Sequence, residues 1–276
     1  MIDISQIDFS TLDCPEVLRL LFHPRPESSV SSFVADRSVS EKSMIQDAMI
    51  PVEEHITIGA RFHMTERIGA NILFFHGNGE IVADYDDLGP IYNQMGINFL
   101  AVDYRGYGRS GGEPTVTAMM RDCHVIFNFV RKWLLKNDFP GPMVPMGRSL
   151  GSASVLEIAA NYQDLMGGII VESGFAYAGP LLKLLGINLE RLGFKEDKSF
   201  RNVDKIRHFH KPTLIIHAEH DHIISFSDGQ ALYEACPAAN KTFLNIPGAN
   251  HNDIFMRGMQ AYLAAVKSLV ESILLK

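Results

Sequence analysis

The sequence has only three cysteines among its 276 residues, Cys14, Cys123 and Cys236, and they stand far apart. Such a sparse, odd set forms neither a disulfide framework nor a short-spaced zinc motif, so we expect free thiols in a reducing compartment. No apolar run approaches the ~18 residues of a membrane-spanning helix. The first residues, MIDISQIDFSTLDC, lack the basic start and apolar stretch of a signal peptide. These absences predict a cytoplasmic protein without a stable membrane anchor.

Positive charge is also scarce, because 25 Lys and Arg residues stand against 32 Asp and Glu, a formal net charge of −7. Nucleic acids and anionic membrane surfaces bind basic faces, so we expect neither as the main partner. The composition is that of a globular protein, with 46% apolar and 21% charged residues. At this length we predict a single α/β domain over residues 1–276.

From residue 71 onward, apolar runs alternate with helical patterns. We predict strands at 72–75, 97–102, 143–146, 168–171, 213–216 and 241–246, and helices at 81–95, 115–136, 152–162, 227–235 and 253–275. This alternation predicts an α/β fold with a mainly parallel sheet and helices on both faces.

An N-terminal extension over 1–47 precedes this region and contains a predicted short helix at 14–21 and a Ser-rich surface connection at 26–41. Two runs at 48–52 and 55–64 follow it, and the second alternates apolar and polar residues. They predict an antiparallel hairpin at the edge of the sheet.

The pattern G-x-S-x-G, which marks a serine nucleophile on a sharp strand-to-helix turn, occurs twice. GRSLG at 147–151 stands between a predicted strand and a predicted helix. GRSGG at 108–112 is followed by Glu-Pro at 113–114, so no helix starts there. We therefore predict that Ser149 is the nucleophile and that Ser110 is a loop residue.

The second segment also contains G-x-G-x-x-G, formed by Gly106, Gly108 and Gly111. A dinucleotide site requires a helix that opens on the last glycine of this motif. Because Glu-Pro follows at once, we predict no nucleotide site here, and we expect no cofactor.

A serine nucleophile needs a base and an acid that orients the base, and in this strand-to-helix arrangement they follow the serine as acid and then histidine. Asp221 comes after the predicted strand 213–216, and His251 comes after the predicted strand 241–246. Both loops lie at the carboxyl ends of strands, on the edge where we place Ser149. We predict Asp221 and His251 as its partners.

Other residues near these loops compete for the two roles. Glu219 and Asp253 are alternative acids, and His217, His220 and His222 are alternative bases. The run HAEHDH at 217–222 also resembles a metal site, but no carboxylate–histidine set here has the spacing of a known zinc motif. We therefore predict no metal.

The segment FHGNG at 75–79 follows a predicted strand directly. A glycine-containing turn at this place allows a backbone N–H to point at the substrate oxygen, and the N–H of Leu150 would be the second donor of an oxyanion hole. A tight turn with a helix cap would use the same glycines.

Residues 174–200 interrupt the alternation of strands and helices with a stretch rich in Leu, Gly and aromatics. We predict a small helical insertion, on which Leu181, Leu184 and Leu185 share one face and Leu182 is turned partly away. If this insertion is a lid, Phe175, Leu181 and Leu185 bind the substrate. If it is not, the same leucines pack it onto the domain.

Five motifs, read together, resemble a known superfamily. HGNG at 76–79, DYRGYGRSGG at 103–112, GRSLGS at 147–152, the loop around Asp221 and the segment 248–251 are similar to α/β-hydrolases over about residues 56–276. The first three are similar to the alpha/beta-hydrolase-domain esterases and thioesterases, a subgroup that includes protein depalmitoylases.

This resemblance implies Ser149, Asp221 and His251 as the catalytic triad, and the N–H groups of Asn78 and Leu150 as oxyanion donors. Only Cys14 stands where the depalmitoylases carry an N-terminal cysteine cluster, so we expect a soluble acyl-ester hydrolase and do not expect membrane-bound protein substrates. The predicted function is hydrolysis of carboxylic esters or thioesters through an acyl-enzyme. Alternatives are a serine peptidase or acyl-transfer enzyme on the same fold, and a non-catalytic small-molecule-binding homologue.

Overall fold

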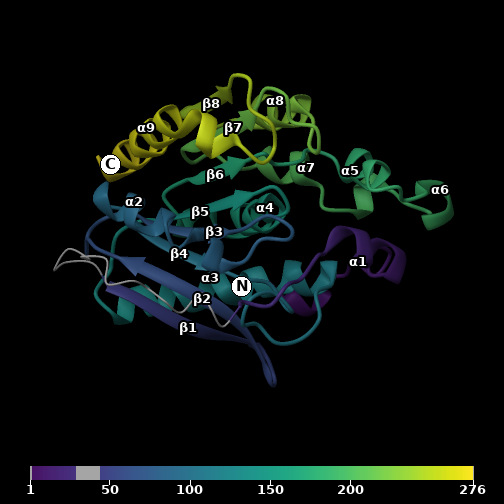
Figure 1. Cartoon of the computed structure of the whole chain (residues 1–276), viewed down its shortest axis with the longest axis horizontal. Helices are drawn as coiled ribbons and strands as arrows, with labels where there is room; N and C mark the ends of the chain where they lie inside the picture. The colour runs from purple at the N-terminus through teal and green to yellow at the C-terminus, as the bar shows by residue number, and fades with distance from the viewer. Residues whose placement is uncertain (1, 29–43, 276) are drawn as a thin grey trace.

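One eight-stranded sheet runs through the part of the chain that the computed structural model describes, residues 2–28 and 44–275 (Figure 1). Its strands are β1 (Met44–Glu53), β2 (Ile56–Met64), β3 (Asn71–Phe75), β4 (Asn98–Val102), β5 (Met143–Arg148), β6 (Ile169–Glu172), β7 (Thr213–Ala218) and β8 (Lys241–Ile246). The spatial order is β1-β2-β4-β3-β5-β6-β7-β8. The pairs β1/β2 and β2/β4 are antiparallel, and the other neighbours are parallel. This is the predicted α/β architecture with its antiparallel edge hairpin.

Alternate residues of the central strands point to opposite faces of the sheet and fill two separate cores. In β3, Leu73 and Phe75 belong to one core, and Ile72 and Phe74 belong to the other. Helices α3 (Val116–Lys136), α4 (Gly151–Tyr162) and α8 (Phe226–Ala235) cover the first core, and α2 (Leu88–Gln94) and α9 (Ile254–Leu274) cover the second. Because both faces of the sheet are covered, the central strands are continuous apolar runs. Their positions could therefore be predicted from the sequence.

The longest helices, α3 and α9, each have 21 residues and bury one face. In α9 the buried positions Tyr262, Val266, Leu269, Val270 and Ile273 recur with the helical period. Within residues 2–28 and 44–275, no helix has both the length and the apolar character that crossing a membrane requires.

The single helix predicted over 81–95 is wrong. The structure has a 3-10 turn, η3 (Val82–Tyr85), followed by the separate helix α2. Pro90 has no N–H, and it is tolerated at the third position of α2 because that N–H needs no partner within the helix. A continuous helix would require the missing hydrogen bond, so the chain turns before residue 88.

The N-terminal segment contains η1 (Ile4–Gln6) and α1 (Pro15–Leu21) and packs against the first core. Val17 and Leu21 of α1 are buried, and the rings of Phe9 and Phe200 lie 5.8 Å apart between centroids. Most of the connection predicted over 26–41 falls in 29–43, outside the described residues.

A short 3-10 turn, η4 (Gln163–Leu165), follows α4. The insertion predicted at 174–200 contains α5 (Ala178–Leu184), α6 (Leu189–Leu192) and η5 (Glu196–Lys198), and α7 (Asn202–Ile206) follows it. In Figure 1 it projects from the side of the molecule, near α1. Leu182 is buried and Leu184 is 57% exposed. The predicted face is therefore wrong, because α5 packs onto the core through Leu182.

A buried ion network joins α3, α4 and α7. The Glu157 carboxylate lies 3.1 Å from His124 Nε2 and 2.7 Å from Lys205 Nζ. The Tyr162 hydroxyl lies 3.0 Å from His124 Nδ1. Burial alone would raise the pKa of Glu157, but the hydrogen bond to His124 and the charge of Lys205 outweigh it and lower that pKa to about 2. The network therefore stabilises the fold only while Glu157 is ionised.

We expect Glu157→Gln to lower the free energy of unfolding at pH 7 by about 3 kcal/mol. Because the pKa of Glu157 is lower in the folded than in the unfolded chain, the contribution is complete above pH 4.5 and is lost as the pH falls towards 2. Urea unfolding across this range should show the gap between wild type and variant closing. The exposed Glu190→Gln is the control and should change the free energy by less than about 0.5 kcal/mol. A gap that is equal at every pH would contradict the ionised network.

Candidate active site

Ser149 occupies the sharp turn between β5 and α4. Its φ is +52°, in the left-handed region that residues other than glycine rarely adopt. A Cβ atom on Gly147 would lie 2.4 Å from the Gly151 carbonyl oxygen, and one on Gly151 would lie 2.1 Å from the Phe75 carbonyl oxygen. Both glycines of the motif are therefore required by close backbone approaches. The Ser149 N–H donates to the Glu172 carbonyl at 2.8 Å, which fixes the turn to β6.

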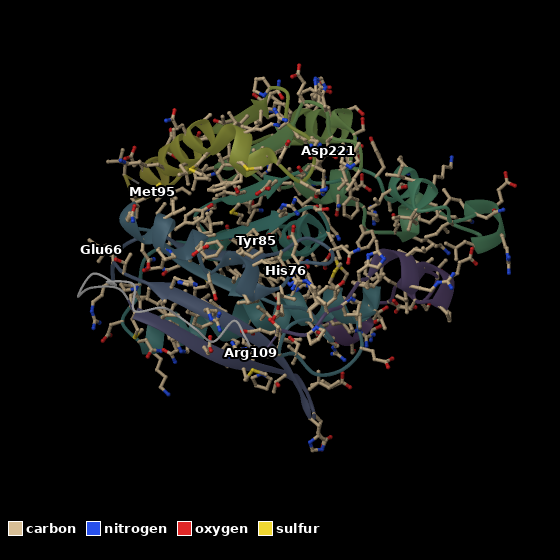
Figure 2. All side chains as sticks on the ribbon, in the orientation of Figure 1. Glu66, His76, Tyr85, Met95, Arg109 and Asp221 are labelled. Carbon is tan, nitrogen blue, oxygen red and sulfur yellow. The ribbon has the colours of Figure 1, made fainter. Side chains whose placement is uncertain are left out.

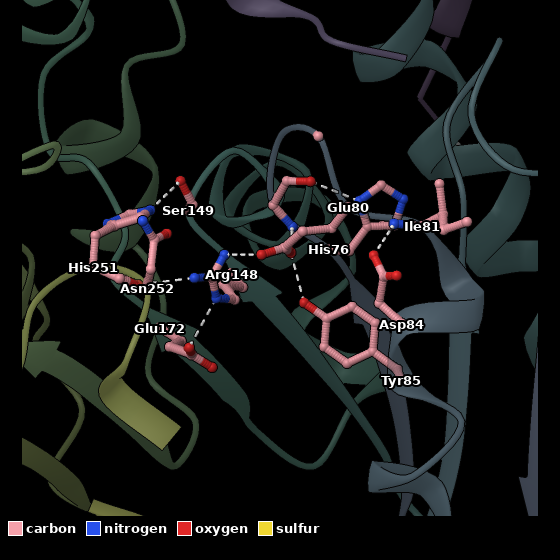
Figure 3. A network of polar contacts seen from close by, with 12 residues as sticks. His76, Glu80, Ile81, Asp84, Tyr85, Arg148, Ser149, Glu172, His251 and Asn252 are labelled. Carbon is pink, nitrogen blue, oxygen red and sulfur yellow. Dashed lines mark hydrogen bonds and ion pairs between the residues drawn. The ribbon is translucent and has the colours of Figure 1, made fainter. Parts of the chain in front are cut away.

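The three side chains that the sequence singled out meet at this turn. His251 Nε2 lies 3.1 Å from Ser149 Oγ (Figure 3), and His251 Nδ1 lies 2.7 Å from Asp221 Oδ2. Ser149 and His251 are both buried. Asp221 follows β7 and His251 follows β8, which are neighbouring parallel strands. The arrangement has the geometry of a nucleophile, its base and an orienting carboxylate.

The electrostatics of Asp221 suit the orienting role. Burial raises the pKa of Asp221, but the hydrogen bond from His251 and the N–H groups of Ile223 and Ile224, at 2.9 and 2.8 Å, outweigh it. The net effect is a lowered pKa. The carboxylate therefore stays ionised at neutral pH and holds the proton of His251 on Nδ1.

The alternative bases lie elsewhere in the same loop. His217 is buried, with Nε2 3.0 Å from the Ile224 carbonyl oxygen, and burial lowers its pKa. His220 is exposed beside Glu219, and His222 is also exposed. The structure brings none of these three histidines within hydrogen-bond distance of Ser149.

The alternative acids shape the loops. Glu219 accepts a hydrogen bond from the Gly248 N–H at 2.7 Å, and Asp253 accepts one from the Asn250 N–H at 2.7 Å. Over the described ranges, no three His, Cys, Asp or Glu side chains are grouped so that they could hold a metal ion.

The second G-x-S-x-G segment lies in the connection between β4 and α3 and contacts the edge hairpin. Ser110 Oγ accepts a hydrogen bond from the Gly59 N–H of β2 at 2.9 Å. The neighbouring Arg109 lies on the side of β1 and β2 (Figure 2), where its guanidinium is 2.6 Å from Asp47. Ser110 is thus a loop residue that supports β2.

The turn after β3 carries Asn78, and Leu150 directly follows Ser149. Among the residues that the structure describes, the backbone N–H groups of Asn78 and Leu150 have no hydrogen-bond acceptor, although Leu150 is buried. The Asn78 side chain fixes its own turn, since its Oδ1 accepts hydrogen bonds from the Tyr107 hydroxyl at 2.7 Å and the His23 N–H at 2.8 Å. Two backbone donors are therefore left free beside the nucleophile turn.

Comparison with known proteins bears on the family and the fold. A family model described as serine aminopeptidase, S33, matches residues 66–193. Human alpha/beta hydrolase domain-containing protein 17B is 31% identical over 210 residues, and protein 17C of Xenopus tropicalis is 31% identical over 209 residues. Each match covers 72% of this chain but only 65% and 61% of the relatives, less than two thirds of their length.

Solved structures share the fold. Est1E from Butyrivibrio proteoclasticus, with bound ferulic acid, is 19% identical with a TM-score of 0.66, over 83% of this chain and 100% of that one. A soluble variant of monoglyceride lipase from Saccharomyces cerevisiae, in complex with a substrate analogue, is 17% identical with a TM-score of 0.67, over 85% and 97%. The chain belongs to the α/β-hydrolase superfamily.

In this α/β-hydrolase, two of the three residues predicted to bind substrate line one pocket. Phe175 and Leu181 lie in the wall of a cavity of about 220 Å³ between α5 and the loop of Asp221. Its other lining residues are Tyr177, Pro180, Leu184, Asp221, His222, Ile223, Ile224, Ser225 and Asp228. Leu185 does not line this cavity and is half-buried against the first core.

Two groups of contacts in this α/β-hydrolase were not predicted from its sequence. The Arg25 guanidinium donates to the Gly79 carbonyl at 2.8 Å, so that, with His23, the N-terminal segment holds the turn of Asn78. Arg148 reaches three segments around the nucleophile. A charged residue between a buried strand and the nucleophile was the one signal that pointed to Arg148. The N-terminal contacts had no local signal.

A matched pair of glycine substitutions compares the two G-x-S-x-G segments. Gly151→Ala places a Cβ against backbone, so we expect a loss of more than about 3 kcal/mol and a clear fall in Tm. Gly111→Ala meets nothing within 4 Å and should change Tm little. Thermal melts of both variants check this, and the reverse order would show that the nucleophile turn is misplaced.

Proposed function

We propose that this chain is a serine hydrolase that cleaves small carboxylic esters or thioesters through an acyl-enzyme, without a cofactor. The observation that carries the proposal is the unbroken chain of contacts from Asp221 to His251 to Ser149, at 2.7 and 3.1 Å. A serine hydroxyl becomes a useful nucleophile when a neutral imidazole at this distance accepts its proton.

The proposed reaction has two halves. Ser149 Oγ attacks the carbonyl carbon while His251 Nε2 takes its proton, and the charge on the carbonyl oxygen is stabilised by the free N–H groups of Leu150 and Asn78. Protonated His251 then gives the proton to the leaving alcohol or thiol, and the acyl group remains on Ser149. Water, deprotonated by His251, attacks the acyl carbon. The bond from that carbon to Ser149 Oγ then breaks, protonated His251 returns the proton to Ser149, and the acid is released. Asp221 stays ionised throughout and stabilises the imidazolium.

The names of the similar structures support an ester over an amide, because Est1E carries ferulic acid and the yeast protein is a monoglyceride lipase. The description of the matching family model, serine aminopeptidase, favours a peptidase as the second candidate. Parallel assays with p-nitrophenyl esters, an acyl-CoA thioester and aminoacyl nitroanilides separate the two. Turnover of the nitroanilides alone would replace the proposed esterase by a peptidase.

We expect Ser149→Ala and His251→Ala to abolish p-nitrophenyl ester hydrolysis, with a loss of about 10³-fold or more in kcat and a retained fold. A fluorophosphonate probe should label wild type and fail to label Ser149→Ala. Ser110→Ala is the matched control and should keep both activity and labelling, because the Ser110 hydroxyl bonds to the Gly59 N–H of β2, whereas His251 bonds to Ser149. An unlabelled wild type would favour a non-catalytic binding protein, and an inactive Ser110→Ala would reverse the choice of nucleophile.

The apolar cavity beside Asp221 is proposed to hold the acyl chain. Each buried methylene contributes ~0.8 kcal/mol, about fourfold in kcat/KM, so medium acyl chains should be preferred to acetate. Leu181→Ala widens the cavity and should change the acyl preference across a series of p-nitrophenyl esters.

Leu185→Ala is the control, because Leu185 is also half-buried but lies outside the cavity wall. It should lower Tm and leave the acyl preference intact. If Leu181→Ala behaves in the same way, the insertion packs on the domain without binding the acyl chain.

A further inference from the structure

We propose that Arg148 is a positioning residue that holds the oxyanion turn and the loop of the catalytic histidine in register with the nucleophile. This inference rests on the proposed function and concerns the same site. Arg148 directly precedes Ser149, its side chain is only 11% exposed, and its guanidinium extends among three segments distant in sequence (Figure 3).

The first segment is the turn that carries Asn78. One terminal nitrogen of Arg148 forms a hydrogen bond and ion pair with Glu80 Oε1. The other carboxylate oxygen of Glu80 accepts the Gly77 N–H and the Tyr85 hydroxyl, both at 2.6 Å. Glu80 therefore transmits the position of Arg148 to the backbone immediately before Asn78.

The second segment carries the base. Arg148 Nη2 donates to the main-chain carbonyl of His251 at 2.8 Å. Because this bond holds the backbone of His251, it limits the movement of the imidazole relative to Ser149. Asp221 orients the ring, and Arg148 holds the loop from which the ring extends.

The third segment is the end of β6. Arg148 Nε lies 3.2 Å from Glu172 Oε1, and the second oxygen of Glu172 accepts the Tyr262 hydroxyl at 2.6 Å. Burial lowers the pKa of Arg148, but the charges of Glu80 and Glu172 outweigh it, so the net shift is upward and the guanidinium stays charged. A planar guanidinium presents its N–H donors on three nitrogens in a fixed fork, and here Nε, Nη1 and Nη2 each reach a different partner, whereas a lysine carries all its donors on one atom.

The test uses Arg148→Lys, which keeps the charge but cannot reproduce the three-way contact. Removing the charge altogether would leave the Glu80 and Glu172 carboxylates without their cationic partner and endanger the fold. We expect a fall in kcat of ~10–100-fold for a p-nitrophenyl ester, with KM within ~2-fold of wild type, because small displacements at an active site act mainly on the chemical step.

The rates for an ester and for its thionoester together distinguish a positioning role of Arg148 from a purely structural one. The developing sulfur anion fits an oxyanion hole less well than oxygen, so an ordered hole gives a high ratio of the two rates. Arg148→Lys should lower this ratio. The control is Arg105→Lys, since Arg105 is similarly buried and bonded to Asp122 and Glu53. It should lower Tm while kcat and the ratio stay within ~2-fold of wild type.

A second, less disruptive pair of variants tests the inference if Arg148→Lys does not fold. Tyr85→Phe removes one hydrogen bond to Glu80 without changing any charge, and Tyr162→Phe removes a buried hydroxyl that contacts His124. Tyr85→Phe should lower the oxygen-to-sulfur ratio, and Tyr162→Phe should leave it unchanged.

Four results would overturn the inference. An unchanged kcat and an unchanged ester-to-thionoester rate ratio in folded Arg148→Lys would show that Arg148 only forms a buried ion pair. An equal loss of kcat in Arg105→Lys would show the same. If Arg148→Lys does not fold, an unchanged ratio in Tyr85→Phe would do the same. A wild type that neither hydrolyses esters nor reacts with the fluorophosphonate would instead remove the proposed function, and the inference with it.

Discussion

The close contact between Gly151 and the Phe75 carbonyl sets the geometry on which the whole site depends. It brings the first turn of α4 against the end of β3, where any side chain on residue 151 would collide with backbone. Phe75 leads directly into the turn of Asn78, and Gly151 lies two residues after Ser149. One contact between backbones therefore sets how closely the turn of Ser149 and the turn of Asn78 approach, and the Arg148 side chain bonds to the segments around it.

Charge around this contact is buried, and it is balanced by specific partners. Glu80 and Glu172 lie on either side of Arg148, and tyrosine hydroxyls bond to the remaining carboxylate oxygens. Isolated, such groups would be costly to remove from water. Together they form a network that is satisfied in one arrangement of the three segments, so it specifies that arrangement as well as stabilising it.

The strands and the meeting of Ser149, Asp221 and His251 at one edge of the sheet could be predicted because their signals are local. A strand covered on both faces is a continuous apolar run, and Asp221 and His251 each follow such a run in the expected order. The break between η3 and α2 was missed, although Pro90 was visible, because the apolar period continued through it. The burial of Leu182 and the contact of His23 with Asn78, 55 residues away, depend on tertiary packing that no local pattern records.

The order of the strands has a consequence for the chain as it is synthesised. Ser149 and His251 are 102 positions apart, and β7 and β8 are added to the sheet after β6. Until they emerge from the ribosome, the apolar strand β6 is an open edge whose N–H and C=O groups have no neighbour on that side. Open apolar edges pair readily with other chains. The nascent protein therefore passes through a stage that is prone to aggregate and in which Ser149 still lacks its contact with His251. Both conditions end when β7, β8 and the loop after β8 have been added.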